Sequence, residues 1–188
     1  MKRLALFIVA ALALLAPAGA AAKGPSAATI TGPGLSSSVA IHGEGEGDTS
    51  TDLGLLVMDG GWFQQVYGAY GGSSVRLRSA PRDLGARYVV TYTVPGGSTT
   101  SRLEQSLYPY AAGGPVTYMR PGQVFWDTQK TAGGWNRGTA QLKQMLLSAG
   151  LPKSPPPASE RTHGRTIGVA AGAGIALAAA VLALRRRR

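Results

Sequence analysis

The chain has 188 residues, no cysteine and a formal net charge of +10. Without cysteine, neither a disulfide nor an acylated lipoprotein anchor can form. The positive charge is typical of nucleic-acid-binding proteins, but most of it lies at the two ends of the chain. Residues 23–153 carry eleven basic and eight acidic side chains, a net charge of +3. We therefore exclude nucleic acid as the partner.

The first 22 residues have the pattern of a secretory signal peptide. Lys2 and Arg3 precede an uncharged apolar stretch, residues 4–16. Small residues then allow cleavage after either Ala20 or Ala22. The apolar stretch is shorter than a membrane span requires. The pattern predicts export of the chain, with residues 1–22 removed.

The C-terminal segment predicts a membrane anchor. Residues 153–165 form a polar, proline-rich linker, and residues 166–184 contain only Ala, Gly, Val, Ile, Leu and one Thr. Nineteen helical residues span about 28 Å, close to the thickness of the bilayer core. Four arginines, residues 185–188, then predict a cytoplasmic tail. We expect a single-pass protein of the cell membrane with its N-terminus outside and its lipid-embedded helix near the C-terminus.

Two further patterns near the anchor have alternative interpretations. The segment Leu151-Pro152-Lys153-Ser154-Pro155 resembles a sortase signal, but Ser and Pro replace the Thr and Gly of that motif. Gly168, Gly172 and Ala176 are spaced four apart and would let two membrane helices approach closely. Helix–helix association in the membrane is the hypothesis, and chance spacing in an Ala-rich segment is the alternative.

Residues 23–152 are expected to form one extracytoplasmic domain of the α+β class. Short strands are predicted at 28–31 and 39–42, a hairpin at 86–94 and 99–108, and a second hairpin at 116–120 and 123–126. Helical patterns occur at 53–59 and 142–149, and residues 62–67 are a candidate for a further helical turn. These patterns predict a small antiparallel sheet with one or two packed helices.

Several short segments resemble one group of proteins. They are Asp83-Leu84-Gly85-Ala86-Arg87-Tyr88, Leu107-Tyr108-Pro109-Tyr110, Pro121-Gly122-Gln123 and Gly133-Gly134-Trp135. With the anchor, they are similar to exported, C-terminally membrane-anchored proteins of high-GC Gram-positive bacteria. The resemblance covers about residues 50–152 and implies the topology given above. It implies no activity, cofactor or catalytic residue.

Candidate chemical groups are few in the predicted domain. Its one histidine, His42, has no cysteine or G-x-S-x-G segment to accompany it, so we name no catalytic residue. Glu44, Glu46, Asp48 and Asp52 alternate partly with glycine in the manner of a calcium loop. Thr49 and Leu55 stand where that motif requires Gly and Glu, so we predict no metal and no cofactor.

Aromatic residues carry the binding hypothesis. Most of them are needed for the core, but Tyr108, Tyr110, Trp126 and Trp135 lie among Gly and Pro and could line an exposed platform. The sequence thus predicts a non-enzymatic binding module of the cell envelope whose partner is a protein or a glycan. The alternative is a hydrolase or transferase that acts on cell-wall material with a pair of carboxylates.

Overall fold

The computed structural model describes residues 24–43, 49–68, 71–96 and 99–156, all within one compact unit, Met1–Ala158. The predicted signal peptide, the acids Glu44, Glu46 and Asp48, most of the linker, and the predicted anchor with Gly168, Gly172 and Ala176 lie outside the described residues. Within the described ranges, no helix combines the length and apolar character that a bilayer span needs.

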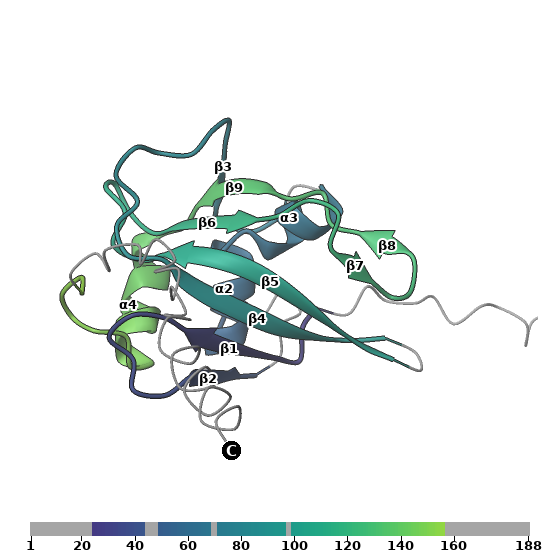
Figure 1. Ribbon diagram of the computed structural model, residues 1–188, viewed down its shortest axis with the longest axis horizontal. Coiled ribbons are helices and arrows are strands. Elements are labelled where there is room, and N and C mark those ends of the chain that lie inside the picture. Colours follow the sequence, from purple (N-terminus) through teal and green to yellow (C-terminus); the bar gives the residue numbers. More distant parts are fainter. Residues whose placement is uncertain (1–23, 44–48, 69–70, 97–98, 157–188) are drawn as a thin grey trace, which may run out of the picture. The chain divides into compact units, whose positions relative to one another are not determined.

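The described residues form an α+β structure dominated by a seven-stranded antiparallel sheet (Figure 1). The strand order is β2-β1-β4-β5-β6-β9-β3, and a separate two-stranded ribbon pairs β7 with β8. The strands of the large sheet are β1 (Ala27–Thr31), β2 (Val39–His42), β3 (Val75–Leu77), β4 (Tyr88–Pro95), β5 (Thr100–Tyr108), β6 (Val116–Met119) and β9 (Gly134–Arg137). Those of the ribbon are β7 (Val124–Phe125) and β8 (Gln129–Lys130).

Three helices are found in the same residues: α2 (Asp52–Asp59), α3 (Trp62–Tyr67) and α4 (Ala140–Ser148). Thr51 caps α2 by accepting a hydrogen bond from Gly54 N, and Thr139 caps α4 by accepting one from Leu142 N. Figure 1 shows α2 and α3 behind the central strands of the sheet. We call the helix side of the sheet the covered face and the opposite side the open face.

The central hairpin explains how the sheet acquires two different faces. Along β4, fully buried residues alternate with half-buried ones, as period-two side-chain alternation requires. The register of β4 with β5 places Tyr92 opposite Leu103 and Tyr88 opposite Leu107, so that all four face the helices. The core is completed from the helices by Leu53, Leu56, Trp62, Val66, Leu142 and Leu146.

The covered face also contains a buried network of polar side chains, which we call the glutamine network. Gln105 donates to Gly60 O (3.1 Å) and to the Gln65 side chain, and it accepts from the Tyr92 hydroxyl (2.8 Å). Gln65 in turn donates to Thr117 Oγ1 (3.1 Å). Because burial removes water as a partner, these side chains must satisfy one another. The network fastens the junction of α2 and α3 to three central strands.

The sequence-based expectations are confirmed for the α+β class, for the first two strands, for the hairpin of β4 and β5, and for all three helical segments. The sheet is larger, and more helices pack on it, than the expected small sheet with one or two helices. The predicted second hairpin is wrong, because β6 pairs with β5 and β9 whereas β7 pairs with β8. Backbone hydrogen bonds with a strand distant in sequence outweighed the local Pro121-Gly122 turn.

Candidate functional site

The open face of the sheet presents the second set of alternating side chains. Strand pairing aligns Val89, Ser106, Tyr118 and Trp135 in one row across β4, β5, β6 and β9. Each residue of this row is adjacent in sequence to a residue of the covered face. The row therefore follows from the same registers that build the core.

Three aromatic residues meet on this face, and we call them the aromatic cluster. Trp135 lies between the two tyrosines: its ring centroid is 4.5 Å from that of Tyr118 and 5.9 Å from that of Tyr108. The ring planes are inclined by 31° and 28° respectively. All three side chains are partly exposed. A partly exposed group of aromatic rings on a sheet is a common feature of binding surfaces.

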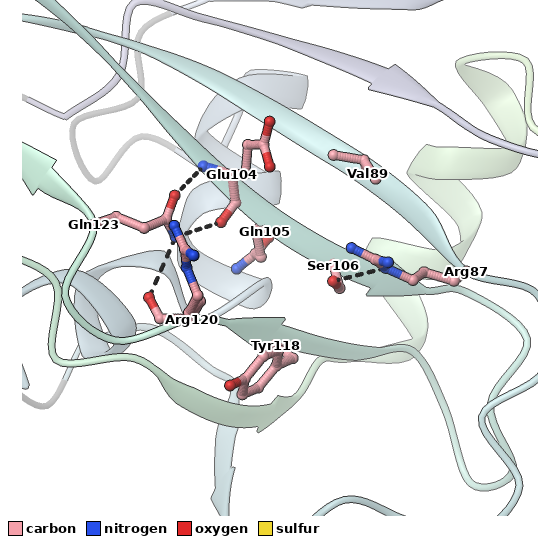
Figure 2. A pocket seen from close by; sticks show the side chains of 8 residues that line it. All are labelled: Arg87, Val89, Glu104, Gln105, Ser106, Tyr118, Arg120 and Gln123. Carbon is pink, nitrogen blue, oxygen red and sulfur yellow. Dashed lines mark hydrogen bonds between the residues drawn. The ribbon is translucent and has the colours of Figure 1, made fainter.

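Beside the aromatic cluster lies a hollow of about 350 Å³ (Figure 2). Tyr118 belongs to both features, since its ring contacts Trp135 and also lines the hollow. The hollow is lined mainly by polar residues just before and along β4, on β5 and β6, and in the loop after β6. These residues are Arg87, Val89, Glu104, Gln105, Ser106, Tyr118, Arg120 and Gln123.

The Gln123 side chain fixes one wall of the hollow. Its Oε1 accepts from Glu104 N (2.8 Å), and its Nε2 donates to Glu104 O (2.7 Å) and Arg120 O (3.3 Å). The amide therefore replaces the strand partner that β5 lacks at this point. The arrangement holds the loop after β6 against β5. It thereby fixes the backbone at Arg120 and Glu104, from which their side chains extend toward the hollow.

The charged groups of the hollow are largely uncommitted. Arg87 donates from Nε to Ser106 Oγ (3.0 Å) and has no other hydrogen bond or ion pair within the described residues. There too, neither the Arg120 guanidinium nor the Glu104 carboxylate has such a partner. In Figure 2 the two arginines extend from opposite sides of the hollow, with Ser106 near Arg87. The hollow thus offers a ligand the N–H donors of two arginines and the carboxylate of Glu104, none of which is paired with a charged group within the described residues.

The four aromatic residues predicted from the sequence lie in different surroundings. Tyr108 and Trp135 meet in the aromatic cluster. The Tyr110 ring packs against Tyr88 with centroids 6.2 Å apart, and its hydroxyl donates to Pro152 O. Tyr110 thus fastens the segment after α4 and lies outside the aromatic cluster.

Trp126 is held by the β4–β5 hairpin. Its indole Nε1 donates to Pro95 O (2.8 Å), and its ring contacts Phe125 and Tyr67. Trp126 and Asp127 have φ angles of 45° and 63°, unusual for non-glycine residues, in the turn between β7 and β8. Packing and hydrogen bonds that offset this strain indicate a structural function for the side chain.

Sequence reasoning missed Tyr118, Arg87 and Arg120 as members of the site. The alternation of residues 116–119 predicts that Tyr118 and Thr117 lie on different faces of the strand, but it does not reveal which face the helices cover. His42 lies exposed on the edge strand β2. Within the described ranges, no group of three or more His, Cys, Asp or Glu side chains is arranged to hold a metal ion.

Comparison with family models, with curated proteins and with solved structures finds no match to this chain. The case for function therefore depends on the chemistry of the open face.

Proposed function

We propose that the protein is a binding module of the cell envelope that takes its ligand on the open face of the sheet. The observation that carries the proposal is the hollow next to the aromatic cluster, where Tyr118 contributes to both. The site combines ring surfaces with charged groups that have no partner in the described residues. A pocket on which a few polar groups converge beside aromatic rings is typical of a ligand site.

The proposal includes membrane anchoring, which is supported by the sequence patterns at the two ends and by the resemblance to exported, anchored proteins. Residues 1–22 would direct export, and residues 166–184 would span the bilayer with the basic tail inside. Protease added to intact protoplasts should then remove the domain, while an epitope placed after Arg188 stays protected. Protection of the domain itself would contradict this topology.

A binding function explains the hollow better than the hydrolase or transferase alternative. Acid–base catalysis on a glycan requires two carboxylates that flank the scissile bond. The residues that line the hollow include one carboxylate, Glu104. It lies beside two arginines, a combination that suits the recognition of a polar ligand.

The test of the proposal is retention of the full chain, in detergent micelles, on isolated envelope material. Trp135→Ala should lose most of the binding, because it removes the central ring of the aromatic cluster. Trp126→Ala is the matched control, since it removes an aromatic side chain away from the open face. Circular dichroism must show that both variants fold. Unchanged retention of folded Trp135→Ala would contradict the proposal.

A further inference from the structure

We propose that the hollow recognises an anionic saccharide, with the acid group of the sugar bound between Arg87 and Arg120 and the ring beside Tyr118. This inference rests on the proposed function and specifies the class of ligand. Three properties of the hollow favour this class of ligand: its charge, its polar lining and its position on the sheet.

The charge of the hollow favours an anion. Arg87 and Arg120 extend from opposite sides, and neither is paired with a carboxylate in the described residues (Figure 2). A guanidinium presents a planar set of donors that matches the oxygen atoms of a carboxylate or a phosphate. The bond from Arg87 Nε to Ser106 Oγ orients the guanidinium while its terminal amino groups stay available. Two such groups in the lining of one hollow favour a ligand that carries an acid group.

The rest of the lining favours a sugar as the carrier of that acid group. The Glu104 carboxylate has no partner in the described residues and can accept from ligand hydroxyl groups. The partly exposed ring of Tyr118, which also packs on Trp135, provides an aromatic surface against which the C–H face of a sugar ring can pack. The volume of about 350 Å³ lies within the range of small-ligand sites, about 300–1,000 Å³.

The position of the hollow disfavours an extended peptide. The hollow lies over β4, β5 and β6, three interior strands of the sheet, whose backbone groups are paired with neighbouring strands or, at Glu104, with the Gln123 side chain. Added-strand recognition needs a free sheet edge. In this sheet the edges are β2 and β3.

The experiment uses a matched pair of probes. The full chain in detergent micelles is titrated with an oligouronide and with the methyl ester of the same oligomer, and a phosphorylated oligosaccharide serves as a third probe. The acid should bind at least about tenfold more tightly than the ester, as charge-assisted hydrogen bonds imply. The third probe distinguishes recognition of phosphate from recognition of carboxylate.

Arginine variants then assign the effect to the hollow. Arg87→Gln and Arg120→Gln should each weaken binding of the acidic probe about tenfold or more, and should weaken binding of the ester much less, because only the charge-assisted part of the interaction is specific to the acid. Arg102→Gln is the control, because Arg102 is exposed on the same strand as Glu104 but does not line the hollow. It should change binding less than about twofold.

Several results would overturn the inference. Equal binding of acid and ester, no binding of either anionic probe at millimolar concentration, or tighter binding of an acidic peptide or single-stranded DNA would each do so. An equal effect of Arg102→Gln would show that the preference for the acid comes from the overall charge of the protein and not from the hollow. These failures leave the proposed function standing if Trp135→Ala still loses retention on envelope material. If Trp135→Ala keeps that retention, the proposed function itself fails.

Discussion

The two faces of the sheet use neighbouring residues of one strand in opposite ways. On β5, Gln105 is fully buried, and its amide bonds to Gly60, Gln65 and Tyr92. The preceding residue, Glu104, is exposed, and its carboxylate has no partner in the described residues. The difference is one of solvent access. A buried polar group must find a protein partner, whereas a surface group can remain available for a ligand.

The largest expected effect comes from breaking the glutamine network. Gln105→Ala removes the acceptor of the buried Tyr92 hydroxyl and the donor to Gln65 Oε1. It also creates a cavity between the helices and the sheet. The free energy of unfolding should fall by about 3 kcal/mol. Thermal unfolding followed by circular dichroism measures it. The adjacent Glu104→Ala should change stability by no more than about 0.5 kcal/mol. Similar losses in both variants would contradict the division into two faces.

An intermediate effect is expected at alkaline pH. Burial raises the pKa of the Tyr92 hydroxyl above its ordinary value of about 10. Above pH 10 the unfolded chain therefore loses a proton that the folded chain keeps, and stability falls as pH rises. The slope for this one group is about 1.4 kcal/mol per pH unit. Denaturant unfolding between pH 8 and pH 11.5 should show the decline.

Tyr92→Phe provides the control for that titration. The variant should lose about 1 kcal/mol at pH 8, because the hydrogen bond to Gln105 is absent. Its stability should then fall less steeply above pH 10 than that of the unsubstituted chain. An unchanged slope would show that other groups cause the alkaline loss.

The smallest effect on stability is expected on the open face. Arg87 is exposed and, within the residues that the structure describes, makes a single hydrogen bond, to Ser106. Arg87→Gln should therefore change the free energy of unfolding by no more than about 0.5 kcal/mol, while it weakens ligand binding as proposed above. Denaturant unfolding of the variant without ligand measures this. A loss above about 1 kcal/mol would indicate that Arg87 supports the sheet.

Local patterns were sufficient for most of the elements. Alternation from Tyr88 to Val94 predicted β4, and the capping residues Thr51 and Thr139 precede helices that hydrophobic periodicity located. The strand β9 was missed because Gly133 and Gly134 have the composition of a loop. Both have positive φ angles, 69° and 119°. They bring the chain into register with β6, which no local pattern reveals.

The aromatic residues mark the limit of that reasoning. Tyr108, Tyr110, Trp126 and Trp135 have similar neighbours in sequence, yet only the first and the last meet in the aromatic cluster. Pairing of β5, β6 and β9 placed Tyr118 beside Trp135, and the position of the helices decided that this face stays open.

The sequence encodes the positions of the main strands and helices locally, because hydrophobic periodicity and capping act within a few residues. It also supplied the charge patterns at the ends, from which export and anchoring are predicted. The tertiary structure alone decided which polar residues are buried as partners of one another and which remain free. That outcome depends on strand register and on the face that the helices cover, and both are set by contacts between residues far apart in the chain.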